Sequence, residues 1–386
     1  MRLLVVGHAY IVAFNQIKYI EMKRQCEDLE LRILTPRVVP HIFKRHTREL
    51  APSLSTDEVV DIREFFGRSH MSYVFDPLRF AKVIREFQPD RVHIEEDPYS
   101  AVGVEAVFLT HLICPSAKIS FFIWDNLARV PRFPLGFIKR VLNRYSLSKA
   151  DLVVCGNKDG ELLLREKKGY MGRTAVLPQM GVTPDPYVKP QTNLIRNELL
   201  IPVDMPLIGF VGRLIPEKGV SLLLGALHRL KDVEWRVLIL GSGPLESEIT
   251  GKWQQMFGER LIYRKAVPHA DVPAYMRVMD ILVLPSYETR HWKEQFGLVL
   301  AQAMMLGVPC IGSTSGAIPE VIGPGGLIFK ENDVDDLART LERLLADVDL
   351  RKSLAQSAQS FARQNYTHAA VATAYLKQWG FIEFES

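Results

Sequence analysis

Two cations and the expected start of a helix follow an apolar stretch in the second half of the chain. The stretch 206–211 leads into a loop with Arg213 and Lys218, and a helix with one apolar side is expected from Gly219. A helix N-terminus offers unpaired N–H groups and a positive dipole end. Cations and amide donors at the carboxyl end of a strand suit a pyrophosphate. The alternative is a surface loop whose cations pair with Glu217.

A second segment combines a carboxylate with an amide that is expected to be buried. Glu294 precedes an apolar helix expected over 298–306, which Gly307 and Pro309 terminate. Gln302 is the only polar side chain of that helix, and leaving it buried without a partner costs about 1–3 kcal/mol. It must therefore bond to a ligand or to a neighbouring backbone group. Glu294 binds a ligand or is simply a favourable charge at a helix start.

Common nucleotide signatures are absent from the sequence. Residues 241–243 begin a Gly-x-Gly pattern, but Glu246 stands where the third glycine is needed, and no Gly-Lys-Ser/Thr follows a glycine-rich loop. These absences count against a dehydrogenase and a P-loop enzyme. A small-residue loop at 313–317 would let backbone approach a sugar or phosphate closely.

The elements that position these residues are short apolar stretches bounded by Gly, Pro or Asp, which predict strands of buried parallel sheets. The expected strands are 2–6, 31–35, 91–95, 119–123 and 151–155, then 206–211, 236–240, 281–285, 308–312 and 326–329. Helical patterns such as 220–230 and 334–345 separate them, so the β-α order of a doubly wound sheet occurs twice. Prolines and polar residues at 182–205 interrupt this order, which predicts an α/β protein of two Rossmann-like domains joined there.

Composition is that of a soluble two-domain protein, with 386 residues, 47% hydrophobic and 24% charged. The net charge of +4 is too mild to indicate nucleic acid. The apolar start ends at Gly7, too early for a signal peptide, and no stretch is long enough to span a bilayer. Four scattered cysteines without a His cluster argue against metal binding and a disulfide framework, so a cytoplasmic location is expected.

The chain resembles the retaining glycosyltransferases of family 4, the glycosyl transferases group 1, which have the GT-B architecture. The resemblance rests on motifs that occur in this order: Gly212-Arg213-x4-Lys218-Gly219, Gly241-Ser-Gly-Pro244, Pro285-Ser286, Glu294-x-Phe296-Gly297, Gly307-x-Pro309 and Gly316-x-x-Pro319-Glu320. They cover most of the second half and are highly specific, whereas the first half matches weakly. The resemblance implies parallel sheets facing across a crevice, with an acceptor domain (1–185), a nucleotide-sugar domain (186–367) and a final helix (368–386) packing back on the first.

The resemblance also implies roles for individual residues. Arg213 and Lys218 would hold the donor pyrophosphate, and Glu294 would bind hydroxyls of the donor sugar. Gln302 would bind the ribose. Further donor-binding positions are Gly212, Phe296, Gly297, Leu298 and Gly241, with Ala266 and Val267 facing the base. No metal and no cofactor besides the donor substrate are implied.

This sequence departs from the family pattern at three places. Family members commonly carry Glu where this chain has Gln302, and a neutral amide accepts from a ribose hydroxyl more weakly than a carboxylate does. His8 follows the first strand in place of a glycine pair, and Asn126 lies where many members have a His. Both are acceptor-side candidates by location, as is Tyr99, or are hydrogen-bonded loop residues. No general base is identifiable.

Positive charge is concentrated in the first half. Residues 1–185 hold 27 Lys and Arg against 22 Asp and Glu, a net of +5, and the remainder nets −1 with 21 against 22. The stretches 31–48 and 126–150 contain no acid, and the second interleaves its cations with apolar residues. That composition fits a helix lying on an anionic membrane surface, or a solvated helix that packs its apolar face on the domain.

Together these features predict a metal-independent glycosyltransferase that transfers a sugar from a UDP- or GDP-sugar to a glycan or lipid-linked acceptor, in polysaccharide or glycolipid synthesis. It would be cytoplasmic, or peripheral on the inner face of the membrane. Two alternatives remain, a catalytically silent nucleotide-sugar-binding subunit and a nucleotide-sugar epimerase of the same architecture.

Overall fold

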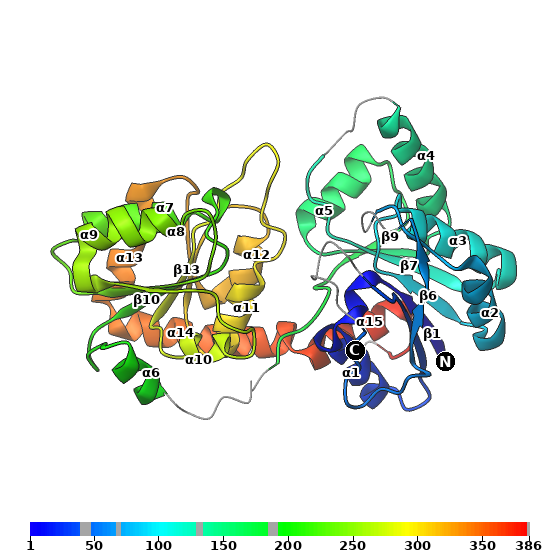
Figure 1. Cartoon of the computed structure of the whole chain (residues 1–386), viewed down its shortest axis with the longest axis horizontal. Helices are drawn as coiled ribbons and strands as arrows, with labels where there is room; N and C mark the ends of the chain where they lie inside the picture. The colour runs from blue at the N-terminus through cyan, green and yellow to red at the C-terminus, as the bar shows by residue number, and fades with distance from the viewer. Residues whose placement is uncertain (39–47, 67–70, 129–133, 184–191, 384–386) are drawn as a thin grey trace. The chain divides into compact units, whose positions relative to one another are not determined.

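The computed structural model describes residues 1–38, 48–66, 71–128, 134–183 and 192–383. The chain divides into two compact units (Figure 1). Unit 1 comprises Met1–Gly181 and His368–Ser386, and unit 2 comprises Val182–Thr367. The boundary expected between residues 185 and 186 lies outside the described residues.

Unit 1 is built on a seven-stranded parallel sheet with the order β3-β2-β1-β6-β7-β8-β9. Its strands are β1 (Arg2–Val6), β2 (Glu30–Pro36), β3 (Val59–Ile62), β6 (Arg91–Ile94), β7 (Lys118–Ile123), β8 (Leu152–Cys155) and β9 (Arg173–Val176). A separate antiparallel pair joins β4 (Glu64–Phe65) and β5 (Val74–Phe75). The chain runs outward from β1 to β3 and then returns to place β6 against the other side of β1. The strand order therefore reverses between β1 and β6.

Helices pack on both faces of this sheet, so the side chains of β1 are buried on both sides. Leu4 and Val6 belong to a core shared with α2 (Pro77–Phe87) and α3 (Ala101–Ile113). Leu3 and Val5 belong to a core shared with α1 (Ile17–Gln25) and α15 (His368–Trp379). The remaining helices are α4 (Leu135–Ser148) and α5 (Lys158–Leu162).

The last helix of the chain, α15 (His368–Trp379), lies beside α1 (Ile17–Gln25) near the start of the chain (Figure 1). The Gln25 side chain donates to the Ala369 carbonyl at 2.9 Å and accepts from the Thr373 hydroxyl at 2.7 Å. The C-terminal helix is thus part of unit 1.

Unit 2 is built on a six-stranded parallel sheet with the order β12-β11-β10-β13-β14-β15. Its strands are β10 (Leu207–Val211), β11 (Arg236–Leu240), β12 (Leu261–Arg264), β13 (Ile281–Leu284), β14 (Cys310–Ser313) and β15 (Gly326–Phe329). Here the strand order reverses between β10 and β13. The helices are α6 (Thr192–Glu198), α7 (Val220–Arg229), α8 (Glu246–Glu248), α9 (Gln254–Phe257), α10 (Val272–Met276), α11 (Leu298–Met305), α12 (Ile318–Ile322), α13 (Val334–Ala346) and α14 (Val348–Tyr366).

All ten strands expected from apolar stretches are present, and the expectation of two parallel sheets is confirmed. The sequence pattern missed the edge strands β3, β9 and β12, and the β4–β5 pair. An edge strand is only partly covered, so its sequence needs no continuous apolar stretch. Thus β9 (Arg173–Val176) has no fully buried residue. No helix among the described residues is both long and apolar enough to cross a bilayer.

Candidate functional site

The two cations predicted to bind phosphate lie at the carboxyl ends of the unit 2 strands, where the strand order reverses. Gly212 and Arg213 directly follow β10, and Lys218 ends a short 3₁₀ turn (Pro216–Lys218) before α7. Arg213 is exposed and forms no ion pair with any described residue. In open α/β sheets this position is where ligands bind.

Lys218 is paired with Glu294 and not with Glu217, the partner expected if the loop were only a solvated surface. Its ammonium donates to Glu294 Oε2 at 2.6 Å, and the Ser286 hydroxyl donates to the same oxygen at 3.0 Å. Glu294 is buried, whereas Lys218 keeps 15% of its side chain exposed. The ammonium also lies 5.1 Å from the Trp292 ring centroid. The structure therefore brings together two predicted residues from motifs 76 residues apart.

Two glycines let the loops around this cluster approach one another. Gly219 has φ = +71°, and a Cβ there would lie 1.9 Å from the Pro285 carbonyl oxygen. Gly316 has φ = +51°, and a Cβ there would lie 2.1 Å from the Glu294 carbonyl oxygen. Any other side chain would push the loops after β13 and β14 away from the cluster.

Two helix N-termini next to this cluster have glycine as the N-cap. Gly219 caps α7 and Gly297 caps α11, whose first residue is Leu298. Glycine has no side chain to accept a hydrogen bond, so the first N–H groups of each helix remain available to a ligand. Phe296 is half-buried and its ring packs edge-on against Tyr366, with 5.6 Å between centroids.

The remaining predicted donor residues form a second group at the ends of β11 and β12. Gly241 follows β11, and the Ala266 amide donates to the neighbouring Ser242 hydroxyl at 3.1 Å. Ala266 is exposed and Val267 half-buried. Gln302 is half-buried on α11, and its amide nitrogen lies 3.1 Å from Nε2 of His269. The observed partner of Gln302 is a side chain, not the backbone group considered from the sequence.

In unit 1, His8 lies where the strand order reverses between β1 and β6. Both its backbone N–H and its Nδ1 lie 2.7 Å from Glu96 Oε1, and the Tyr73 hydroxyl donates to that oxygen at 2.9 Å. Burial alone lowers the pKa of His8, but the charge and hydrogen bond of Glu96, with the charges of Asp97 and Glu95, outweigh it and raise the pKa.

Next to this pair is a buried ion pair that the sequence did not reveal. The Lys18 ammonium donates to Glu95 Oε1 at 2.7 Å and to the Gln179 carbonyl at 2.6 Å, and both charged side chains are fully buried. Burial alone raises the pKa of Glu95, but the charge of Lys18 and the hydrogen bond from His93 hold it well below its usual range. The pair joins α1 to the end of β6.

The other two acceptor-side candidates lie near the ends of β6 and β7. The Tyr99 hydroxyl donates to Asp97 Oδ2 at 3.0 Å, and the Lys139 ammonium lies 3.5 Å from the Tyr99 ring centroid. Asn126 is buried after β7. Tyr99 and His8 therefore contact adjacent carboxylates of one loop, Asp97 and Glu96.

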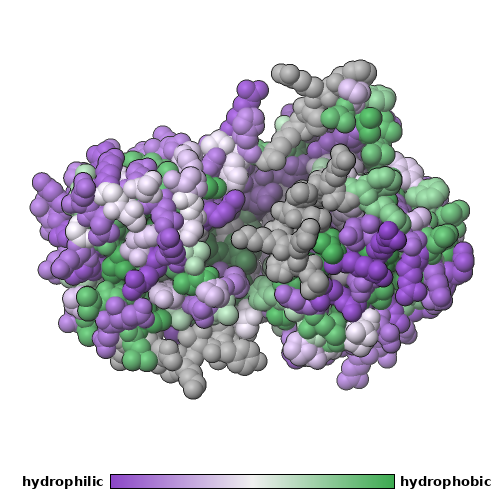
Figure 2. Space-filling model, viewed as in Figure 1, coloured by the Kyte–Doolittle hydropathy of each residue, from purple (hydrophilic) through white to green (hydrophobic). Residues whose placement is uncertain are grey.

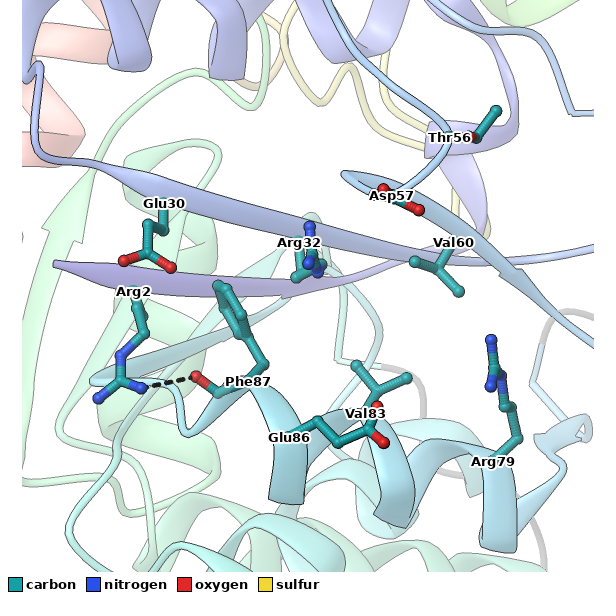
Figure 3. A pocket seen from close by; sticks show the side chains of 10 residues that line it. All are labelled: Arg2, Glu30, Arg32, Thr56, Asp57, Val60, Arg79, Val83, Glu86 and Phe87. Carbon is teal, nitrogen blue, oxygen red and sulfur yellow. Dashed lines mark hydrogen bonds between the residues drawn. The ribbon is translucent and has the colours of Figure 1, made fainter.

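A cavity of about 360 Å³ lies at the opposite, amino-terminal end of the unit 1 sheet (Figure 3). Arg2, Arg32 and Arg79 line it together with Glu30, Asp57 and Glu86, so its charges balance. The Arg2 guanidinium donates to the Phe87 carbonyl at 3.1 Å. None of the predicted site residues lines this cavity.

Sequence reasoning missed Glu96 and His269 as partners of the candidates His8 and Gln302. It also missed the buried pair of Lys18 and Glu95. A weak signal existed for the carboxylates, because three acids in a row, residues 95–97, stand at the end of an expected strand. Nothing local marks Lys18 or His269. No group of three or more His, Cys, Asp or Glu among the described residues is arranged to hold a metal ion.

Residues 191–361 match the family model described as "Glycosyl transferases group 1". The D-inositol 3-phosphate glycosyltransferase of Corynebacterium efficiens is 33% identical over 193 residues, which are 47% of this chain and 44% of that protein. An uncharacterized glycosyltransferase of Methanocaldococcus jannaschii is 29% identical over 350 residues, 88% of this chain and 87% of that protein. The chain spans about half the length of the corynebacterial relatives that it matches.

Solved structures are similar over the whole chain at low identity. A glycosyltransferase from Rickettsia africae ESF-5 has a TM-score of 0.74 at 17% identity, with 100% of this chain and 99% of that chain aligned. Anabaena HepE in complex with UDP has a TM-score of 0.71 at 17% identity, with 99% of this chain and 100% of that chain aligned. At these identities the similarity shows the fold, and the predicted GT-B architecture is confirmed.

Proposed function

The chain carries a glycosyl transferases group 1 domain in residues 191–361, and from this premise we propose that it is a retaining, metal-independent glycosyltransferase. It moves a sugar from a nucleoside diphosphate donor to a glycan or lipid-linked acceptor. Unit 2 binds the donor and unit 1 binds the acceptor. HepE has been solved with UDP and with UDP-glucose, which favours a UDP-sugar as the first donor to test.

One observation carries the proposal: the cluster of Lys218, Glu294 and Ser286 at the reversal of strand order in unit 2, on a loop that also carries exposed Arg213. The glycine-capped start of α7 adds backbone N–H donors. When the bond between the anomeric carbon and the phosphate oxygen breaks, negative charge grows on the pyrophosphate. Fixed cations and dipoles at that position stabilise the transition state more than the ground state.

Glu294 has two roles in this proposal. Its carboxylate holds the Lys218 ammonium in place before the donor arrives. It is also the candidate for binding a hydroxyl of the donor sugar, and the hydrogen bond from Ser286 to its Oε2 helps to fix its position.

Thermal shift with UDP-, GDP- and ADP-glucose tests the donor assignment. We expect one nucleotide to raise the melting temperature of the wild type, by mass action on the folded state. Release of nucleoside diphosphate in the presence of an acceptor then separates an enzyme from a silent binding subunit. An epimerase would change the sugar without needing an acceptor. No stabilisation by any of the three nucleotides contradicts the proposal.

A lipid-linked acceptor is favoured by the surface of α4. Its side chains Leu135, Phe137, Ile138 and Val141 are exposed, with Arg140 and Arg144 beside them. Figure 2 shows hydrophobic residues gathered over this helix. The helix does not bury this apolar face on its own domain, and an anionic bilayer would cover both kinds of group.

The other basic stretch, residues 31–48, contributes fewer cations to a membrane-binding surface. Arg37 and Arg48 both pair with Asp61, at 3.0 and 2.9 Å, and Arg32 lines the cavity at the amino-terminal edge of the sheet. Lys44, Arg45, Arg129, Arg132 and Phe133, which belong to the two basic stretches, lie outside the described residues. We therefore assign membrane contact to α4 alone.

A further inference from the structure

The cavity between the amino-terminal ends of β1–β3 and helix α2 in unit 1 has no part in the donor chemistry described above. On the face of β2 that α2 covers, Glu30 and Arg32 line the cavity, and Leu34 is the first residue of the hydrophobic core. On β1, Arg2 likewise precedes Leu4 of that core. A sheet face under a helix is normally apolar. The charged positions therefore call for a ligand or for water.

Three arginines of the cavity come from three different elements, Arg2 from β1, Arg32 from β2 and Arg79 from α2. None of them forms an ion pair with a residue that the structure describes. Within the same part of the chain, the side chains of Arg32 and Arg79 donate no hydrogen bond. Guanidinium groups bind phosphate and carboxylate groups through two parallel N–H donors. The cavity thus offers such donors without a protein partner.

Phe87, the last residue of α2, positions two of these guanidinium groups. Its backbone carbonyl accepts from the Arg2 side chain at 3.1 Å (Figure 3). Its ring centroid lies 5.3 Å from the central carbon of the Arg32 guanidinium. Phe87 itself is buried. Because one buried residue contacts both arginines, an anion that binds them loses less free energy to ordering of their side chains.

The acids of the cavity are not used to neutralise these arginines. Glu86 pairs with Lys82 of the same helix, at 3.6 Å. Glu30 and Asp57 are exposed, and neither forms an ion pair with a described residue. A carboxylate accepts hydrogen bonds from hydroxyl groups, and Thr56 adds a hydroxyl of its own to the lining. The acids therefore suit the neutral, hydroxyl-bearing part of a ligand.

The size of the cavity indicates a ligand larger than a phosphate ion. Its volume of about 360 Å³ is that of a small-molecule site. Figure 3 shows Arg2 and Thr56 on opposite sides of the cavity, with Asp57 near Thr56. Val60 and Val83 add apolar wall between the charged groups. An anionic group and a polyhydroxyl group are thus accommodated at separate places.

We propose that this cavity binds a small phosphorylated sugar or polyol. Arg2 and Arg32 hold its phosphate, and Asp57 and Thr56 bind its hydroxyl groups. Arg79 adds a third positive charge to the site. The cavity is at the end of the unit 1 sheet opposite the carboxyl ends of its strands, and the donor is assigned to unit 2. The ligand is therefore a second one, and its site does not depend on the proposed function.

Calorimetric titration of the full chain with glucose 6-phosphate, inorganic phosphate and glucose tests the proposal. Arg32→Lys keeps the charge but loses the paired N–H donors. Arg79→Gln changes an exposed residue of the site, and Arg85→Gln, an exposed arginine of α2 outside the lining, is its matched control. Arg213→Ala in unit 2 shows whether the phosphate binds at the donor site instead. Melting temperatures establish that each variant is folded.

We expect glucose 6-phosphate to bind the wild type more tightly than either inorganic phosphate or glucose. Arg32→Lys should weaken that binding on the order of 10-fold, because bonds to a charged group are lost, and Arg79→Gln should weaken it by a few-fold. Arg85→Gln and Arg213→Ala should retain the wild-type affinity. If Arg32→Lys does not fold, the comparison of Arg79→Gln with Arg85→Gln decides.

The proposal is overturned if the wild type does not bind glucose 6-phosphate, or if the folded cavity variants bind it as the wild type does. Equal affinity for inorganic phosphate contradicts the sugar or polyol part of the assignment. Loss of binding in Arg213→Ala places the phosphate at the donor site and also contradicts the proposal. A wild type that binds glucose 6-phosphate here but no nucleotide supports this site and contradicts the proposed glycosyltransferase function.

Discussion

Each unit has an ion pair where its strand order reverses, and the two pairs differ in what they leave accessible to a ligand. In unit 2, Lys218 and Glu294 adjoin glycine-capped helix starts, and the loop of Lys218 also carries exposed Arg213, so positive charge and N–H donors are available to a ligand. In unit 1, Glu95 and Glu96 are buried and already bonded to Lys18 and His8. The first arrangement suits an anion, whereas the second ties the loop after β6 to β1 and α1. One fold, used twice in this chain, therefore carries two different kinds of charged cluster on the loops after its strands.

The comparison is tested most strongly by removing the buried cation of unit 1. Lys18→Met leaves the Glu95 carboxylate buried without its partner, which should cost about 3–5 kcal/mol of the free energy of unfolding. Lys218→Met in unit 2 removes a cation that is 15% exposed and leaves Glu294 its hydrogen bond from Ser286, so we expect a smaller loss than in Lys18→Met. Denaturant unfolding of both variants measures the difference. Equal losses of the free energy of unfolding in the two variants would contradict this difference between the two ion pairs.

The same ion pair predicts a pH dependence of stability. The pKa of Glu95 is held well below its usual range by Lys18 and His93 despite burial, so its contribution is complete above the unfolded-state value of about 4.3. That contribution is lost as the pH falls below this value toward the folded-state pKa. The stability advantage of the wild type over Glu95→Gln should therefore shrink as the solution is acidified. An advantage that grows on acidification would contradict the assignment.

The next largest effect is expected in unit 2, on turnover and not on stability. Arg213→Ala and Lys218→Ala should each lower turnover on the order of 10²-fold, because each removes a preorganised cation from the developing charge. Arg229→Ala, at the opposite end of α7, is the matched control and should retain activity. Steady-state kinetics and melting temperatures are measured together. Near-normal rates in both site variants would refute the pyrophosphate assignment.

A smaller effect is expected at the surface of unit 1. The wild type should cosediment with anionic but not neutral vesicles, and high salt should abolish binding. Replacing Arg140 and Arg144 by Ser should weaken binding by about 1 kcal/mol per residue without changing nucleotide affinity. Lys139 is left in place because it packs on Tyr99.

Exposed cations of α2 supply the control, Lys82→Ser with Arg85→Ser, which should leave vesicle binding unchanged. If the wild type ignores anionic vesicles at low salt, the charges of α4 are a solvated face. A soluble acceptor is then the better assignment.

The smallest effect is expected at position 302. Gln302→Glu should leave nucleotide affinity equal or a few-fold tighter, since a carboxylate accepts from a ribose hydroxyl more strongly than an amide, while partial burial of the charge opposes the gain. Titration of the nucleotide by melting temperature measures this. A variant that unfolds, or that no longer responds to nucleotide, would show that Gln302 acts structurally through His269.

The parts of the fold that were predictable from the sequence are those with a local cause. Leu3 to Val6 are buried on both faces of a sheet, and only an apolar stretch tolerates that environment. An edge strand does not need a continuous apolar stretch, so the polar residues Arg173 and Thr174 of β9 did not predict a strand. The position of Arg213 and Lys218 between a strand and a helix start was predictable because these residues lie within a few positions of one another.

The sequence by itself determined the order of the buried strands and the loop after β10 that carries Arg213 and Lys218. Only the tertiary structure decided which charges pair: Lys218 with Glu294, His8 with Glu96, and Lys18 with Glu95, across 76 to 88 residues of chain. Such partners meet only when parallel strands align and bring their carboxyl ends to one edge of the sheet. The local sequence does not specify that alignment, because each strand can pair with many other strands until the core is packed.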